Sequence, residues 1–274
     1  MPEDMAISRQ LTLFLVATQF LTRLPVPALR GFQTSWLSES ARFFPLVGVL
    51  VGLINVGVWW LASHWFPAPV SVGIMLALSL LVTGAFHEDG FADACDGFGG
   101  GTTPERTLAI MKDSRVGAYG AIGIAMLLGL KWTTLVAVPA PAFPILVIGA
   151  HWVSRWCAIG LIWGLRYVRD NDDAKSKPLA DSLTGVDWML SGLLGGAAVL
   201  PAFLLHDQWK NPAILLASGA GALAALITAA LVAAYFRRRI GGYTGDCLGA
   251  VQQLSELGFL MAALAALMRT PPLV

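Results

Sequence analysis

Seven long apolar stretches are the feature that most constrains how this chain can fold. A helix needs about 20 residues to cross the roughly 30 Å hydrocarbon core of a bilayer. Only 13% of the residues are charged and 56% are hydrophobic, too little polar surface for a water-soluble globule of 274 residues. The sequence therefore predicts an all-α, polytopic transmembrane bundle of about seven spans. They run approximately over Phe44–Phe66, Val70–Phe86, Ala118–Val138, Phe143–Leu165, Trp188–Leu205, Ala213–Phe236 and Cys247–Met268.

A shorter apolar run precedes these stretches, at Leu11–Leu21. It ends at Thr22–Pro27, where two prolines cannot comfortably continue a helix. We interpret it as an N-terminal interfacial or re-entrant helix, with an eighth span as the alternative. No removable signal peptide, soluble domain or linker is evident, so we expect residues 1–274 to form a single integral membrane domain.

The basic residues predict the orientation of the bundle. With the N-terminus in the cytoplasm, most of the 18 Lys and Arg residues fall in loops on the cytoplasmic side, and only Lys210 and Arg269 fall outside. This is the bias expected of a cytoplasmic (inner) membrane protein. We therefore expect the active side to face the cytoplasm. The lipid bilayer is the expected partner, and a net charge of +1 gives no indication of nucleic acid.

A cluster of acids follows the second apolar stretch, in the segment His87–Asp96. Asp89, Asp93 and Asp96 are spaced i, i+4, i+7 and would share one face of a helix. Like charges on one face destabilise a helix unless something neutralises them. Carboxylates suit Mg²⁺, which keeps waters or substrate phosphates in its remaining positions. The segment predicts a Mg²⁺ site for phosphoryl or pyrophosphate chemistry, with a solvated acidic loop as the alternative.

Candidate phosphate-binding groups follow the glycine-rich run Gly97–Gly101. We expect a short amphipathic helix after it, with Thr103 as N-cap and Pro104 in the first helical position. Lys112 and Arg115 come just beyond this helix and offer donors to phosphate. A basic membrane anchor is the alternative interpretation.

A second polar constellation begins the last apolar stretch. Glycines before a helix N-terminus suit an anion, and Asp246 lies near the cap. Polar residues within a membrane face the bundle interior and usually mark function, although a structural network is the alternative. An intramembrane Arg155 needs a partner, for which Glu256 and a bound phosphate are the candidates. One face of the last helix carries Asp246, Gly249, Gln253 and Glu256.

The segment Phe86–Gly97 resembles the signature of the cobalamin synthase family, the adenosylcobinamide-GDP ribazoletransferases. Glu88 is the one departure, because some members carry an apolar residue there. The resemblance covers nearly the whole chain, and the motifs are specific when taken together. Four further blocks agree in the order of the family, at Thr22–Pro27, Phe44–Gly48, Met111–Gly117 and Gly242–Ala250.

This resemblance implies a reaction and its participants. Adenosylcobinamide-GDP would react with α-ribazole or α-ribazole 5′-phosphate in the nucleotide-loop assembly step of vitamin B12 synthesis, with release of GMP and a requirement for Mg²⁺. The enzyme would be a phosphotransferase, and a homo-oligomer is left open. The implied roles are Mg²⁺ ligation by Asp89, Asp93 and Asp96, phosphate binding by Arg23, Lys112 and Arg115, and orientation or deprotonation of the attacking hydroxyl by Asp246 or His87.

Three other readings of the sequence compete with this one. The CDP-alcohol phosphotransferase pattern matches in part, but the segment Glu88–Gly97 lacks the arginine that should follow the alanine. A prenyltransferase would need Asp170–Asp173 as a second acidic loop. An ion-coupled transporter would line a path with Arg155 and Glu256, but it should show internal repeats, and we see none.

Overall fold

The computed structural model describes residues 3–29, 31–168, 183–205 and 211–270, and its regular elements are helices. This confirms the all-α prediction, and each of the seven predicted apolar stretches contains a helix. In chain order the elements are α1 (Glu3–Leu21), α2 (Ser35–Ser40), the 3₁₀ helix η1 (Ala41–Phe43), α3 (Phe44–Ala62), α4 (Ala68–Thr83), α5 (Phe86–Gly100), α6 (Pro104–Met111), α7 (Ala118–Ala137), α8 (Phe143–Gly164), α9 (Gly185–Leu205), α10 (Pro212–Ile240) and α11 (Gly245–Leu267).

The length and apolar composition of the helices are those of a multi-pass membrane protein. Within the described residues, five helical runs are long and apolar enough to cross a bilayer: Ser35–Ala62, α7, α8, α10 and α11. The bent pair α4 and α5 would make a sixth. Helix α9 is apolar over Gly185–Leu200. The expected count of about seven is reached only if α9 also spans, and that number stays a prediction.

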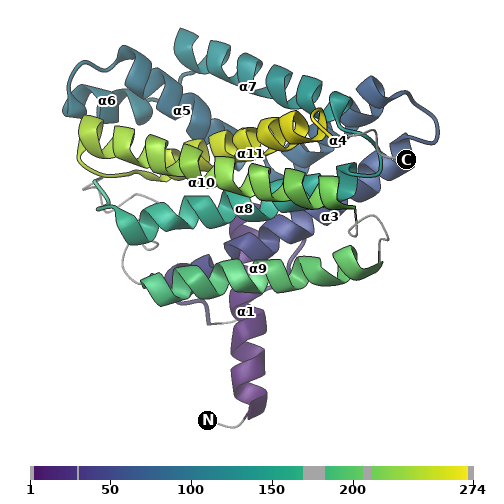
Figure 1. Cartoon of the computed structure of the whole chain (residues 1–274). Coiled ribbons are helices and arrows are strands. Elements are labelled where there is room, and N and C mark those ends of the chain that lie inside the picture. The colour runs from purple at the N-terminus through teal and green to yellow at the C-terminus, as the bar shows by residue number, and fades with distance from the viewer. Residues whose placement is uncertain (1–2, 30, 169–182, 206–210, 271–274) are drawn as a thin grey trace.

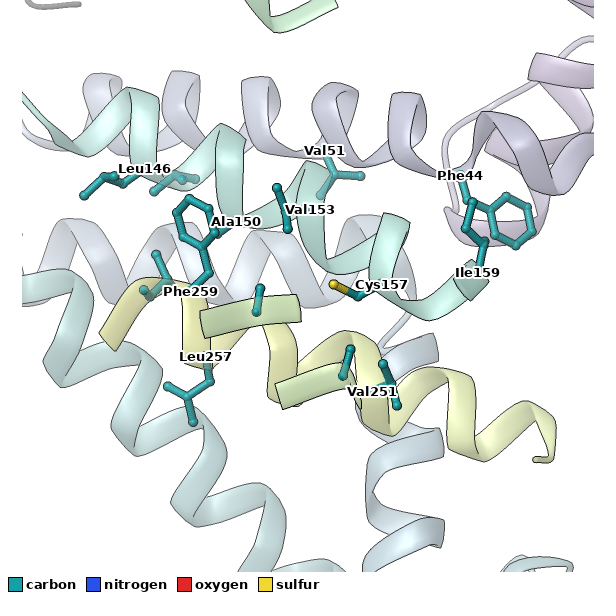
Figure 2. Close-up of a cluster of buried hydrophobic side chains, with 14 of the residues drawn as sticks. Phe44, Val51, Leu146, Ala150, Val153, Cys157, Ile159, Val251, Leu257 and Phe259 are labelled. Carbon is teal, nitrogen blue, oxygen red and sulfur yellow. The ribbon is translucent and has the colours of Figure 1, made fainter. Parts of the chain in front are cut away.

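Helix α8 lies at the centre of the bundle and contacts α3, α9, α10 and α11. The long helices run side by side, whereas α1 crosses them and projects beyond the bundle (Figure 1). The core is built from small and branched side chains that interlock, such as Val51 of α3, Val153 of α8 and Val251 of α11 (Figure 2). Phe259 of α11 fits against Gly149 of α8, where a Cβ would come within 3.0 Å of its ring. Such close packing fixes which helix faces meet.

Tryptophans attach α9 to α8. The rings of Trp156 and Trp188 stack at 4.7 Å, and each indole N–H donates to the backbone carbonyl of the other residue. Trp152 donates in the same way to the carbonyl of Gly192 at 3.2 Å. These bonds satisfy indole donors that would otherwise be unpaired between two apolar helices.

A sharp break between α4 and α5 positions the acidic segment. Gly84 and Ala85 both adopt left-handed backbone conformations, with φ of 63° and 52°, and the two helices meet at 89°. Glycine adopts this conformation readily, while alanine pays roughly 1–2 kcal/mol. The backbone N–H of Arg23 donates to the carbonyl of Val82 at 2.6 Å, which ties the segment after α1 to this break. Helix α5 therefore turns away from the direction of α4.

Candidate functional site

The candidate site is built where α5 crosses the first turns of α11. A Cβ on Gly249 would lie 2.8 Å from the carbonyl oxygen of His87, and one on Gly90 would lie 3.1 Å from the Cα of Asp246. The two helices thus touch backbone to backbone, a contact that only residues without side chains permit. The crossing brings Asp246 against the acidic helix, although the two are far apart in the sequence.

The three aspartates predicted to bind a metal do lie on one continuous helix, but their environments differ. Asp89 is exposed, Asp93 is half-buried and Asp96 is buried. One carboxylate oxygen of Asp96 accepts the backbone N–H of Gly117 at 2.7 Å, and the other accepts that of Gly120 at 2.8 Å. These amides begin α7, so Asp96 stabilises a helix N-terminus that would otherwise have unpaired donors.

The three aspartates are therefore not equally suited to bind a Mg²⁺ ion. Among the residues that the structure describes, no three His, Cys, Asp or Glu side chains are grouped as a metal site. Mg²⁺ does not require such a group, because it is usually held by one or two carboxylates together with waters and substrate phosphates. Asp89 and Asp93, one helical turn apart, suit that arrangement. Magnesium stays a prediction.

The candidate phosphate-binding residues lie around the two ends of α5. Arg23 is exposed, and its side chain lies over Gly84, next to the first turn of α5. Lys112 and Arg115 are exposed in the loop after α6, the loop that leads to the α7 amides bound by Asp96. The α6 helix itself forms as predicted, since the Thr103 hydroxyl accepts the N–H of Arg106 at 3.2 Å.

Arg115 already has an acidic neighbour. Its guanidinium donates to Asp113 at 2.6 Å, and this hydrogen bond holds the pKa of the Asp113 carboxyl at about 2. Because the Arg115 side chain is largely exposed and that of Asp113 is partly exposed, the pair is screened and a phosphate can compete for the same guanidinium. Lys112, beside it, is the second cation of the loop.

Arg239, in the last turn of α10, also supports α5. Arg239 donates to the carbonyl of Gly101 at 2.8 Å, at the C-terminal end of this helix. Its guanidinium also lies over the rings of Phe98 and Tyr235, at 5.7 and 5.4 Å from their centroids. A cation at this position complements the negative end of the helix dipole. Figure 1 shows α5 and α6 at the end of the bundle where α10 ends and α11 begins.

His87 points away from the predicted metal ligands. Residues two positions apart on a helix are separated by about 200°, so Asp89 and His87 occupy opposite faces. His87 is buried at 4% exposure, and its Nδ1 has no hydrogen-bond partner among the described residues. The two candidates for the general base are therefore not equivalent, because Asp246 lies at the acidic helix and His87 faces the interior.

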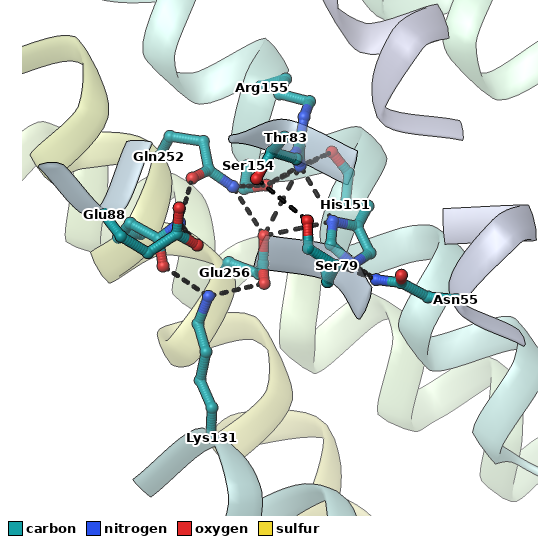
Figure 3. A network of polar contacts seen from close by, with 11 residues as sticks. Asn55, Ser79, Thr83, Glu88, Lys131, His151, Ser154, Arg155, Gln252 and Glu256 are labelled. Carbon is teal, nitrogen blue, oxygen red and sulfur yellow. Dashed lines mark hydrogen bonds and ion pairs between the residues drawn. The ribbon is translucent and has the colours of Figure 1, made fainter. Parts of the chain in front are cut away.

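A buried network of charged groups lies beneath this site (Figure 3). Lys131 of α7 donates to Glu256 at 2.7 Å and to Gln253 at 2.5 Å. The other carboxylate oxygen of Glu256 lies 3.3 Å from His151 Nδ1 and 3.5 Å from Arg155 Nη1. Glu256 thus compensates the buried cations from α7 and α8, and it is the one of the two candidate partners that the structure places beside Arg155.

The network reaches the candidate site through two glutamines. Gln252 donates to Glu256 at 2.6 Å, and Gln253 donates to Glu88 on α5 at 2.7 Å. Glu88, whose role the sequence left open, therefore links the acidic helix to the bundle interior. Sequence reasoning placed Lys131 within a span but gave it no partner. A charged side chain at that depth was the feature of the sequence that could have indicated a buried partner for Lys131.

Comparison with known proteins decides the family. A family model described as cobalamin-5-phosphate synthase matches residues 13–264. The chain belongs to the cobalamin-5-phosphate synthase family. An adenosylcobinamide-GDP ribazoletransferase of Leptothrix cholodnii is 42% identical over 263 residues, which cover 95% of this chain and 97% of the relative. The protein of the same name from Shewanella frigidimarina is 44% identical over 265 residues, with 94% and 95% covered. No solved structure matches this chain.

Membership in the cobalamin-5-phosphate synthase family identifies a transferase and removes the main competitors. It decides against the ion-coupled transporter and against the CDP-alcohol phosphotransferase, whose motif was incomplete. The prenyltransferase reading depended on Asp170–Asp173, which lie outside the described residues. The acidic helix α5 carries the segment on which the family resemblance was first based, so the structure and the family point to the same place in the chain.

Proposed function

We propose that this protein transfers the adenosylcobinamide-phosphate group of adenosylcobinamide-GDP to α-ribazole or α-ribazole 5′-phosphate, releasing GMP. The products are adenosylcobalamin or its 5′-phosphate. The single observation that carries the proposal is the α5–α11 crossing, which holds Asp246 against the helix of Asp89 and Asp93. Curated relatives that cover nearly the whole chain are named for this transfer, which supports the choice of substrates.

In this reaction a ribazole hydroxyl attacks the phosphorus that bears the cobinamide arm. The bond from that phosphorus to the bridging oxygen breaks, GMP leaves, and the hydroxyl proton passes to a base. We assign that base to Asp246, because it adjoins the acidic helix, in preference to His87 on the opposite face. Positioning the two substrates and offsetting negative charge are the main contributions a protein makes to such transfers.

We assign Mg²⁺ to Asp89 and Asp93. When bound, the ion would offset the negative charge of the diphosphate oxygens. Asp96 was predicted as the third ligand. Both of its oxygens accept hydrogen bonds from backbone N–H groups at the beginning of α7. We therefore propose that Asp96 holds α7 and the preceding loop against the site.

In this proposal the basic side chains bind the phosphate groups of the substrates. Lys112 and Arg115 offset the charge of the diphosphate, and Arg23 binds a phosphate group of one substrate. The same cations support a location in the cytoplasmic membrane with the site facing the cytoplasm, where basic loops of membrane proteins gather.

The test is the release of GMP by the purified protein with adenosylcobinamide-GDP, α-ribazole and Mg²⁺. Replacing Asp93 with Asn should abolish turnover while the protein still inserts into membranes. Glu39→Gln is the matched control, because Glu39 pairs with Arg9 away from α5 and its loss should leave turnover intact. Normal GMP release from Asp93→Asn would contradict the metal assignment, and no release from the wild-type protein would contradict the proposed reaction.

A further inference from the structure

An apolar pocket adjoins the α5–α11 crossing, with about 430 Å³ of empty space that includes open solvent. It lies among the end of α1, the beginnings of α3, α5 and α11, and the C-terminal half of α8. Phe20 contacts Phe86 edge to face at 5.2 Å and stacks on Phe44 at 5.7 Å, so aromatic rings form one side. Most of its remaining wall is aliphatic. We call this the aromatic pocket, and its main apolar residues are Phe20, Phe44, Phe86, Ile159, Ile162 and Leu248.

Two buried polar side chains also line the aromatic pocket. Arg155 is 3% exposed and His87 is 4% exposed. Within the described part of the chain, Arg155 Nε and His87 Nδ1 have no hydrogen-bond partner. Buried polar atoms are nearly always paired, so two unpaired ones beside one pocket indicate a ligand that completes them. The pocket is therefore complementary to a mainly apolar ligand that carries a hydrogen-bond acceptor.

We propose that the aromatic pocket holds the benzimidazole base of α-ribazole, an inference that rests on the proposed function. This base is flat and apolar and carries two methyl groups. Its ring nitrogen that is not bonded to the ribose is an acceptor and has no hydrogen. It therefore matches aromatic walls, which favour ring contacts, and the N–H donor at Arg155 Nε.

The other large groups of the two substrates fit the aromatic pocket less well. Guanine carries several N–H donors, and the lining of the pocket contains no Asp, Glu, Asn or Gln side chain to accept them. Unpaired donors make such binding unfavourable. A corrin ring carries amide side chains around its edge, and these would also find few partners in a mostly apolar lining. The base of the nucleoside is the remaining candidate.

The position of the aromatic pocket also suits this assignment. Gly245 and Gly249 line it, and they flank Asp246 on the first turn of α11. Phe86 and His87 line it from the first turn of α5, which also carries Asp89. A nucleoside whose base occupies the pocket would therefore have its ribose near the first turn of α11, which bears the proposed general base Asp246.

The test is to fill the pocket and measure each substrate separately. Ala158 is a small, buried lining residue, and Ala158→Leu would occupy the space of the base. We expect the KM for α-ribazole to rise about tenfold or more, while the KM for adenosylcobinamide-GDP stays within about twofold. Ala77→Leu, on an exposed face of α4, is the matched control and should change neither constant. Equal rises in both KM values, or none, would overturn the inference.

A second measurement uses the wild-type protein and requires no variant to fold. Calorimetric titration should show binding of α-ribazole without the second substrate. The corresponding α-linked adenine nucleoside, whose exocyclic amine meets no carboxylate or amide acceptor in the pocket, should bind about tenfold more weakly or worse. Equal affinities would contradict the base pocket. If α-ribazole binds with this preference but no GMP is released on adding adenosylcobinamide-GDP and Mg²⁺, the pocket stands and the proposed reaction fails.

Discussion

Replacing Asp96 with Asn should loosen the beginning of α7 whether or not Mg²⁺ is present. Asp96 is 8% exposed, and its two carboxylate oxygens accept the amides of Gly117 and Gly120 at 2.7 and 2.8 Å. A hydrogen bond to a charged group contributes about 1.5–3 kcal/mol, and a negative charge at a helix N-terminus adds about 0.3–1 kcal/mol. The asparagine amide keeps one acceptor and turns its NH₂ group toward the other N–H. The expected loss of stability is about 2–3 kcal/mol.

Hydrogen–deuterium exchange of the detergent-purified protein measures this loss directly. The amides of Gly117 and Gly120 should exchange about 30- to 150-fold faster in Asp96→Asn than in wild type, with EDTA or with Mg²⁺, which corresponds to about 2–3 kcal/mol. Asp89→Asn and Asp93→Asn are the matched controls. They should leave the exchange of both amides unchanged while reducing Mg²⁺-dependent release of GMP.

Two outcomes would refute this division of roles among the three aspartates. Exchange at wild-type rates in Asp96→Asn would show that its carboxylate does not hold α7. A loss of protection that appears only when Mg²⁺ is removed from the wild-type protein, and that all three Asn variants reproduce, would make Asp96 a metal ligand equal to the other two.

Three further results follow from the site and the network. Lys131→Met should destabilise the protein by about 3–5 kcal/mol in thermal unfolding, because it removes a buried cation that pairs with Glu256. Gly249→Leu should push α5 away from α11 and lower kcat for GMP release about tenfold or more, with membrane insertion retained. Because the pKa of Asp113 is about 2, its ion pair with Arg115 is intact above about pH 4 and is lost as the pH falls through about 2. Asp113→Asn should therefore leave the shape of the pH–rate profile unchanged between about pH 5 and 9.

Features that depend on local periodicity were predictable from the sequence. The spacing of Asp89, Asp93 and Asp96 placed them on one helical face, and α5 has that face. The Thr103–Pro104 pair predicted the start of α6. The polar face of the last stretch predicted that Glu256 points into the bundle, where it meets Arg155. Helical geometry and the cost of burying charge in a bilayer are sufficient for these inferences.

Contacts between helices were harder to predict, because they depend on which faces meet and in what register. Nothing in the spacing of its neighbours indicated that Asp96 holds the amides of α7, or that Lys131 completes the charge balance of Glu256. The sequence left His87 and Asp246 as alternatives for the base, and the helix crossing places only Asp246 against the acidic helix. The aromatic pocket draws on five helices and has no sequence signature.

The sequence by itself determined that this is an all-α membrane protein, that the acids of α5 form one face, and which family the chain resembles. The length of apolar stretches, the helical period and short motifs are local properties, and they can be recognised without knowing how the helices pack. Only the tertiary structure decided that Gly90 and Gly249 meet, that Asp246 thereby joins the acidic helix, and that Asp96 instead supports α7. Those outcomes follow from backbone contact at the two glycines, where the absence of Cβ atoms lets α5 and α11 approach closely enough to build one site.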